Sequence, residues 1–450
     1  MTREEIIQLI KELDVRFIRF GVFDIDGVLR GKLISTQKFL KAIENHIGFC
    51  NVIFGWDVND ACYDNTLVSG WHTGYPDAFS TIDPNSFRKI PWNDGRPFFL
   101  GDFSDSPTMA EVCPRSILKK VIKEVEQMGF HPKFSAEFEW FNFLETPASL
   151  QQKDFSDLTP LTPGMFGYSV LRTSQNQDYI DDLVDQLYDF GIHLEGIHTE
   201  TGSGVYEAAI TYSDILDAAD NAALFKTSVK EIASRHEITA TFMAKWSLEF
   251  PGYSGHIHQS LWDQEGNNLF TDASKEFGMS SLAQHYLAGQ LYALPYLLPM
   301  FAPTTNSYKR YVEGSWAATT KSWGIENRTT AFRFINQNAG STRIENRVPG
   351  ADANPYLSMA ASLAAGLYGI KNELALEQPP TKGNAYADSS LEQLPKDLSS
   401  ATKAMKEHRL AAELFGATFA DHFIKTREWE LTQLDSSDMK QELKRYFEII

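Results

Sequence analysis

The chain has 450 residues, 43% of them hydrophobic and 22% charged, which is the composition of a folded, water-soluble protein with a large core. Its formal net charge of -18 disfavours a nucleic-acid partner, because proteins that bind nucleic acids gather Lys and Arg on one face. The three cysteines, Cys50, Cys62 and Cys113, have no CxxC spacing, so we expect neither a disulfide framework nor a thiolate zinc site, and we expect a cytoplasmic location.

The first part of the chain predicts a small α+β unit. Residues 5–13 have helical periodicity, and residues 15–35 read as two strands around the turn Asp26-Gly27. The N-terminal segment has no apolar region followed by a small-residue cleavage site, so it is not a signal peptide. From 50 to 105 many turn-forming residues separate short apolar strands. We place a domain boundary at residue 106, which gives domains 1–106 and 107–450.

The second domain predicts longer helices that alternate with polar-rich strands. The apolar window 287–303 is interrupted by Gln290, Pro295 and Pro299, so we expect a buried helix there and no membrane span. The helices are expected at 115–129, 178–190, 214–236, 282–294 and 355–374, and the strands at 133–143, 192–211, 239–262 and 328–348.

The strand KFSAEFEWFNF, residues 133–143, carries two carboxylates on one face. Side chains alternate along a strand, so Glu137 and Glu139 point the same way while Phe138 and Trp140 point the other. Like charges that share a buried face need a cation or a proton between them. The pair therefore indicates a metal site, an acid/base pair, or an edge strand with solvated acids.

Further acids and imidazoles recur on the later strands. Glu200 and Glu207 flank a Gly-Ser-Gly turn, His256 and His258 share one face, and Glu345 lies two residues before Arg347. Five glutamates and a histidine suit a hard divalent cation, Mg²⁺ or Mn²⁺, better than zinc. Taken singly, each of these residues is also compatible with an ordinary surface or core role.

Arginines form the second polar group. Their planar guanidinium groups suit carboxylate and phosphate oxygens, and arginines combined with divalent cations are typical of phosphoryl transfer. No GxxxxGK[ST] motif is present, so a P-loop enzyme is excluded. Five arginines lie within residues 310–347, namely Arg310, Arg328, Arg333, Arg343 and Arg347.

The motifs as a set resemble the glutamine synthetase family, type I-like. The segments AEFEWFNF, HTETGSGVYE, SGHIHQSLW, NSYKR, NRTTAFR, RIENR and ANPYL occur in the order and spacing of that family, most closely from about 115 to 370. The resemblance implies an α+β fold with a small N-terminal β-grasp-like domain and a large catalytic domain built on a curved antiparallel sheet. It also implies a homo-oligomer, a dodecamer of two stacked hexameric rings.

The resemblance further implies an ATP-dependent ligase that uses two or three Mg²⁺ or Mn²⁺ ions. The family makes γ-glutamyl phosphate from ATP and glutamate, and an amine then displaces the phosphate. The implied roles are Glu139, Glu200 and Glu207 for one ion; Glu137, His256 and Glu345 for another; His258 for the ATP phosphates; Arg310 and Arg347 for the substrate carboxylates, with Gly252 beside them; and Arg328 and Arg333 for the transferred phosphoryl group.

The chain departs from the family at the amine site. Ammonia-using members carry a flap glutamate six residues after the arginine of the SYKR motif, and here that position is Trp316. Glu313 is an alternative carboxylate if the flap register shifts. The family's DGSS-type motif is also absent, and Asp57 or Asp60 could take the role of its aspartate. An indole in place of a carboxylate favours a larger, less charged amine.

Two further segments differ from the family pattern. Pro251-Gly252-Tyr253 replaces an Asn-Gly-Ser segment that holds the glutamate amino end, and the flanks of Tyr386 match an adenylylation site poorly. We therefore expect a ligase that joins the glutamate γ-carboxylate to an organic amine. The alternatives are an ordinary glutamate–ammonia ligase, a catalytically inactive structural relative and, less favoured, a zinc hydrolase.

Overall fold

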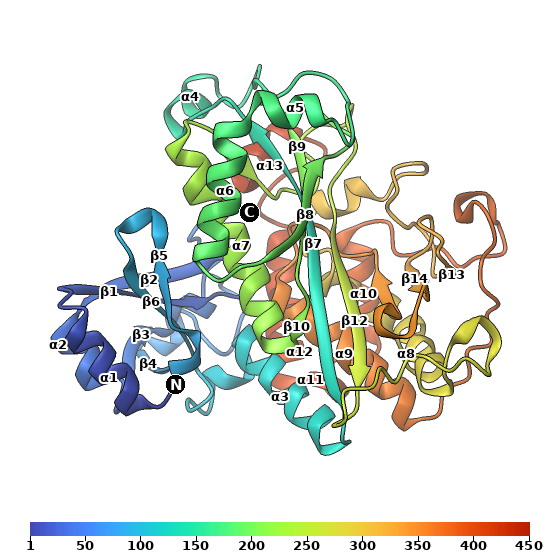
Figure 1. Ribbon diagram of the computed structural model, residues 1–450, viewed down its shortest axis with the longest axis horizontal. Coiled ribbons are helices and arrows are strands. Elements are labelled where there is room, and N and C mark those ends of the chain that lie inside the picture. The colour runs from blue at the N-terminus through green and yellow to red at the C-terminus, as the bar shows by residue number, and fades with distance from the viewer.

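The computed structural model describes residues 1–450 and contains two sheets, one formed by the N-terminal part of the chain and one by the remainder (Figure 1). The N-terminal sheet has the strand order β2-β1-β6-β4-β3, with β5 added beside β6. Its elements are α1 (Arg3–Glu12), β1 (Phe17–Phe23), β2 (Leu29–Ser35), α2 (Thr36–Ala42), β3 (Ile47–Cys50), β4 (Asp77–Ile82), β5 (Arg88–Ile90) and β6 (Arg96–Asp102).

The second sheet has nine strands and carries the polar residues singled out above. Its order is β13-β14-β15-β12-β7-β9-β8, with the short strands β10 and β11 beside β7. All pairs are antiparallel except β13 with β14. The strands are β7 (His131–Phe143), β8 (Leu194–Thr199), β9 (Val205–Ile210), β10 (Ser213–Asp214), β11 (Thr239–Thr241), β12 (Gly255–Trp262), β13 (Trp323–Ile325), β14 (Phe332–Ile335) and β15 (Arg343–Asn346).

Helices cover one face of this sheet and continue below it in Figure 1. Helix α7 packs on β7, and α8, α9 and α3 pack together behind it. The helices are α3 (Pro114–Gln127), α4 (Pro147–Gln152), α5 (Val170–Gln175), α6 (Gln177–Asp189), α7 (Ile215–Arg235), α8 (Ser281–Leu297), α9 (Pro355–Lys371), α10 (Leu398–Glu407), α11 (Leu410–Phe415), α12 (Ala417–Glu430) and α13 (Met439–Tyr446).

The predicted α+β fold is confirmed, and the five helices expected in the second domain correspond to α3, α6, α7, α8 and α9. The segment 192–211 is a hairpin of two strands, β8 and β9, because the Gly-Ser-Gly turn reverses the chain. The C-terminal helices α10–α13 were not predicted. No helix combines the length and the apolar character needed to cross a membrane.

The two sheets have partly separate cores. One cluster of buried apolar residues is formed by side chains from the N-terminal part of the chain, from Ile6 to Cys113 in the sequence. A larger cluster fills the space between the second sheet and its helices. The boundary at residue 106 stays a prediction.

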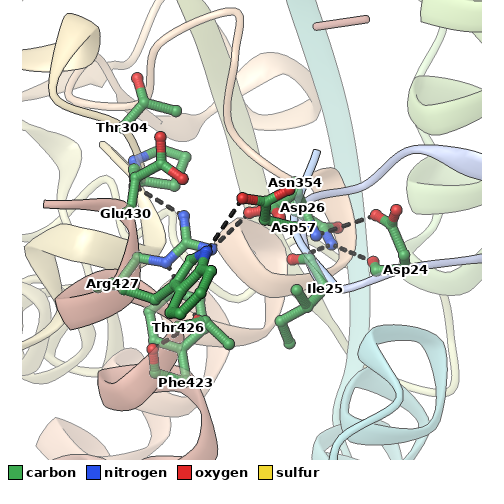
Figure 2. Close-up of polar contacts among 12 residues, drawn as sticks. Asp24, Ile25, Asp26, Asp57, Thr304, Asn354, Phe423, Thr426, Arg427 and Glu430 are labelled. Atoms are coloured by element: carbon green, nitrogen blue, oxygen red, sulfur yellow. Dashed lines mark hydrogen bonds and ion pairs between the residues drawn. The ribbon is translucent and has the colours of Figure 1, made fainter. Parts of the chain in front are cut away.

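A buried polar network ties the N-terminal turn to the C-terminal helices (Figure 2). Arg427 on α12 contacts Asp26 at 2.5 Å, and Asn354 at the start of α9 donates to the carbonyl oxygens of Asp24 and Ile25. Asp57 accepts from the Trp429 indole at 3.0 Å. The tip of the β1–β2 turn is thereby fixed against the larger domain.

Candidate active site

The strand register places the predicted acids and imidazoles in adjacent rows on one face of the large sheet. Glu137 on β7 lies opposite His256 on β12, and Glu139 lies opposite Glu207 on β9. His258 in turn lies opposite Glu345 on β15. The two-residue spacing within each strand keeps these side chains on the same face, as the sequence predicts.

One group of side-chain nitrogen and oxygen atoms has the spacing expected of a cation site. A nitrogen of His258 and a carboxylate oxygen from each of Glu137 and Glu345 lie within 4.8 Å of one another. His256 points Nδ1 at Glu137 Oε1 (3.0 Å) and at Glu345 Oε1 (3.5 Å). The geometry therefore adds His258 to this group, whereas the sequence assigned only His256 to it.

The electrostatics of this group also favour a cation. Burial, reinforced by the nearby Arg347 charge, lowers the pKa of His256 to about 4, so its imidazole is neutral and can act as a ligand at pH 7. His256 Nε2 is buried and has no hydrogen-bond partner. Burial opposes ionisation of Glu137, but hydrogen bonds from His256 and His258 outweigh it and hold the pKa of Glu137 well below its usual range.

The second group of carboxylates contains Glu139, Glu200 and Glu207. Burial, followed by the charges of Glu207 and Glu200, raises the pKa of Glu139 well above its usual value, and burial likewise raises the pKa of Glu207. Such a pair is stable only when a proton or a cation compensates the repulsion. An all-oxygen set of this kind fits Mg²⁺ or Mn²⁺.

His198 belongs to the same region and was missed by sequence analysis. Its Nε2 lies 3.3 Å from Glu207 Oε1, and its ring stacks on Tyr168 at 4.3 Å between centroids. The signal that could have found it is its position two residues before Glu200, although Glu200 itself lies just beyond the end of β8.

Glu345 connects the metal-ligand group to the arginines. Its Oε2 accepts from Arg333 Nη1 at 3.1 Å, and its Oε1 accepts from Arg347 Nη1. Burial would raise the pKa of this carboxyl, but the Arg347 charge leads the interactions that lower it to about 2. Arg343, which received no role from the sequence, donates to His258 Nδ1 at 3.1 Å.

Arg310 is fully buried at the end of a short 3₁₀ helix, Asn306–Arg310. It donates to Ser254 Oγ at 2.9 Å and to the carbonyl oxygen of Val348. Gly252 lies directly against it, because a Cβ at this position would meet Arg310 Cγ at 2.8 Å. The sequence placed both residues at the acid substrate, and the structure brings them together.

Two cavities lie beside these residues. One of about 230 Å³ is lined by Glu137, His258 and Arg343 together with Ser135 and Trp262. The other, of about 580 Å³, is lined by Trp316, Arg328 and Glu326, and Glu326 pairs with Arg333. A further cavity of about 550 Å³ near Arg19 contains none of the predicted site residues.

The predicted flap contacts Arg347 and the loop that contains Tyr386. Trp316 is 58% exposed, and its carbonyl oxygen accepts from Arg347 Nη2 at 3.4 Å. The Arg328 carbonyl oxygen accepts from Arg347 Nε at 3.1 Å, while the Arg328 residue is exposed. Tyr386 donates its hydroxyl to the Ala317 carbonyl oxygen at 3.0 Å, which ties the loop that contains it to the flap.

The two aspartates considered for the amine site both have structural partners. Asp57 is 1% exposed and accepts hydrogen bonds from Arg445 Nη2 at 2.8 Å and from the Trp429 indole at 3.0 Å. Asp60 pairs with Arg30 at 2.8 Å. Within this chain neither carboxylate lies free beside the cation groups.

Comparison with known proteins identifies related sequences over nearly the whole chain. The family described as "Glutamine synthetase, catalytic domain" matches residues 111–446. The chain is 49% identical to "Type-1 glutamine synthetase 2" of Dictyostelium discoideum, over 99% of this chain and 86% of that protein. It is 37% identical to "Glutamate--isopropylamine ligase" of Pseudomonas sp, over 98% of this chain and 97% of that protein.

Two other relatives support the same grouping. "Gamma-glutamylethanolamide synthetase GlnA4" of Streptomyces coelicolor is 34% identical over 99% of this chain and 95% of that protein. The solved structure titled "GmaS/ADP complex-Conformation 1" superposes with a TM-score of 0.82 at 29% identity, covering 97% of this chain and 99% of that chain.

Proposed function

Because this chain belongs to the glutamine synthetase family and is an ATP-dependent carbon–nitrogen ligase of glutamate, we propose that its second substrate is an organic amine. The product would be a γ-glutamylamide. ATP first phosphorylates the γ-carboxylate of glutamate, and the amine then attacks the acyl phosphate and releases phosphate.

The two carboxylate groups would hold divalent cations that neutralise the γ-phosphate and the attacking carboxylate. Glu139, Glu200 and Glu207 form one set. Glu137, Glu345 and the two histidines form the other, in which His256 is assigned to the ion and His258 both to the ion and to the ATP phosphates. Two or three Mg²⁺ or Mn²⁺ ions per site are proposed.

The arginines complete the site. The cavity of about 230 Å³ beside His258 and Arg343 is the proposed nucleotide position, because it opens next to the cation ligands. Arg310 and Arg347 are assigned to the substrate carboxylates, with Gly252 allowing close approach, and Arg328 and Arg333 to the transferred phosphoryl group.

The observation that carries the choice of an organic amine is Trp316. A flap carboxylate would pair with a small ammonium ion, and the exposed indole at this position carries no such negative charge. The indole instead offers an apolar surface to an alkyl or aromatic group. The relatives at 37% and 34% identity both carry the names of amine ligases, in agreement with this choice.

The competing function is an ordinary glutamine synthetase that uses ammonia. It is favoured by the name of the relative at 49% identity. The two functions share every step up to the acyl phosphate, so only the identity of the nucleophile separates them.

We also propose a homo-oligomer, a dodecamer by analogy with the family. The segment that leads into α5, together with the first turn of α5, exposes several large apolar side chains. This segment lies close to Glu200, because a Cβ added to Gly167 would be 3.6 Å from Glu200 Oε2. A neighbouring subunit would cover the apolar side chains. These side chains are Met165, Phe166, Tyr168, Val170 and Leu171.

The test is phosphate release by the purified protein with ATP, Mg²⁺ and glutamate across ammonia, methylamine, ethanolamine, isopropylamine, polyamines and aniline. Turnover with an organic amine well above that with ammonia supports the proposal. Turnover with ammonia alone would show that Trp316 does not exclude ammonia and would support the ordinary synthetase.

A further inference from the structure

The cavity beside Trp316 is lined by residues with an uncommon backbone conformation. Phe277, Trp316 and Glu326 all contribute to its wall, and their φ angles are 58°, 62° and 50°. Non-glycine residues rarely adopt this left-handed region, and such positions cluster at binding and catalytic sites. Three of them around one cavity mark it as a site that the surrounding structure holds in a costly conformation.

The carboxylate of Glu326 is only half satisfied. Its Oε2 accepts from Arg333 Nε at 3.0 Å and also from Arg333 Nη2, whereas its Oε1 is buried and has no hydrogen-bond partner. An unsatisfied buried carboxylate oxygen is costly and is normally paired in a functional complex. The side chain is 33% exposed, so a ligand in the cavity can reach the carboxylate after a small side-chain movement.

A single side chain, that of Arg333, separates Glu326 from the proposed metal ligand Glu345. Arg333 bridges Glu326 on one side and Glu345 Oε2, at 3.1 Å, on the other. The phosphoryl group assigned to Arg333 would therefore lie between the cation ligands and this cavity. A nucleophile held at Glu326 would approach the acyl phosphate from the side opposite the nucleotide cavity.

We propose that Glu326 and Trp316 form the amine subsite, in which the free Oε1 of Glu326 binds the substrate as an ammonium ion and removes its proton while Trp316 covers its carbon chain. This inference rests on the proposed function. It assigns the carboxylate that the flap lacks to a different position, ten residues along the chain from Trp316.

The proposed step is balanced without a further reactant. One N–H proton of the ammonium ion passes to Glu326 Oε1, which leaves a neutral amine with a free electron pair. That pair forms the C–N bond to the acyl carbon, and the C–O bond to phosphate breaks with its electrons leaving on phosphate. The second nitrogen proton goes to the departing phosphate, and Glu326 returns its proton to water.

The other walls of the cavity limit the class of amine. Phe277, Ile325 and Pro380 add apolar surface, while Lys382 is an exposed cation that forms no ion pair. This positive side chain disfavours a second ammonium group at the far end of the substrate. The subsite is therefore suited to a primary amine with a single charge and an apolar body.

The test compares an alkylamine with hydroxylamine as the nucleophile in Glu326→Gln and in the unmodified enzyme. Hydroxylamine is largely uncharged at pH 7 and does not need the base, but it intercepts the same acyl phosphate. We expect Glu326→Gln to lose about 100-fold in kcat/KM for isopropylamine, the scale of general-base catalysis, and to change less than about threefold with hydroxylamine.

Equal losses with both nucleophiles would overturn the inference, because Glu326 would then act only by positioning Arg333. No loss with either would overturn it as well. A matched control is Glu373→Gln, an exposed glutamate with a similar φ of 48°, which we expect to behave like the unmodified enzyme. If Glu313→Gln shows the amine-specific loss and Glu326→Gln does not, the carboxylate is on the flap.

A second measurement checks the substrate class without any substitution. n-Butylamine and 1,4-diaminobutane have the same length and differ by a distal ammonium group, and we expect at least about tenfold higher kcat/KM for n-butylamine. The reverse preference would contradict the assigned subsite. Hydroxamate formation by the unmodified enzyme with glutamate and ATP is the separate check on the proposed function, since its absence would remove the acyl phosphate itself.

Discussion

At the scale of single residues, Glu345 is a carboxylate buried among charged groups. It is 1% exposed, contacts Arg333 and Arg347, and supplies an oxygen to the group that also contains Glu137 and His258. Its two oxygens thus face cationic groups on several sides, which explains why a fully buried carboxylate remains ionised. A residue of this kind links cation binding to the orientation of the arginines that act on phosphate.

Replacing Glu345 by alanine is expected to abolish ATP-dependent phosphate release with glutamate, by at least about 1000-fold, because both a cation ligand and the partner of two arginines are lost. The second expected effect is the loss of the thermal stabilisation that Mn²⁺ gives to the unmodified protein. Retained phosphate release would remove Glu345 from the site.

Trp316 is expected to control the choice of nucleophile. Trp316→Glu places a carboxylate on the flap and should raise the ratio of ammonia use to isopropylamine use by about tenfold or more. Trp316→Phe serves as the control, because it keeps an aromatic ring and should retain the preference for the larger amine. An unchanged ratio in the glutamate variant would contradict the role given to the flap.

At the scale of elements, the 3₁₀ helix that ends in Arg310 is held in place by hydrogen bonds to α13. Glu442 on α13 is fully buried and accepts from Asn306 Nδ2 at 2.7 Å, Lys309 Nζ at 2.8 Å and Thr305 Oγ1 at 3.0 Å. The C-terminal helix therefore fixes the segment that presents Arg310 to the site.

Glu442→Ala removes all three contacts and leaves the Lys309 charge without its partner, so we expect a loss of about 3 kcal/mol in the free energy of unfolding. Because Arg310 is then less well fixed, KM for glutamate should rise more than KM for ATP. Glu448→Ala, an exposed acid close by on the chain, is the control for both measurements. Equal changes in the KM values for glutamate and ATP would argue against a role of Glu442 in fixing Arg310.

The elements of the catalytic sheet show what could be predicted from sequence. The alternation in β7 and β12 was sufficient to place Glu137, Glu139, His256 and His258 on one face, because a strand has only two faces. The contribution of Glu326 was not predictable, since its position beside Arg333 depends on how β14 lies next to β13. The helices α10–α13 carry no site motif and were missed.

At the scale of the whole molecule, buried ion networks join the two sheets. Arg115 on α3 contacts Asp83 and Asp102 from the N-terminal part and Asp220 on α7. Lys119 also contacts Asp102. Burial opposes ionisation of Asp102, but Lys119 and Arg115 outweigh it and lower its pKa to about 2. This network and that of Figure 2 both join the N-terminal part of the chain to helices of the larger domain.

The Asp102 network predicts a pH dependence of stability. The folded-state pKa of about 2 lies below the ordinary value of 3.8, so the contribution, about 2 kcal/mol, is present above about pH 4 and is lost as the pH falls toward 2. Asp102→Asn should therefore be less stable than the unmodified protein at pH 7, and the difference should narrow below pH 4. Asp105→Asn, at an exposed position, should show no such trend.

The most direct test of the account is a competition between nucleophiles. The purified enzyme receives ATP, Mg²⁺, glutamate and equal concentrations of ammonium and isopropylamine, and mass spectrometry identifies the amides formed. The account predicts that γ-glutamylisopropylamide exceeds glutamine. Glutamine as the dominant product would contradict the assignment of an organic amine as the second substrate.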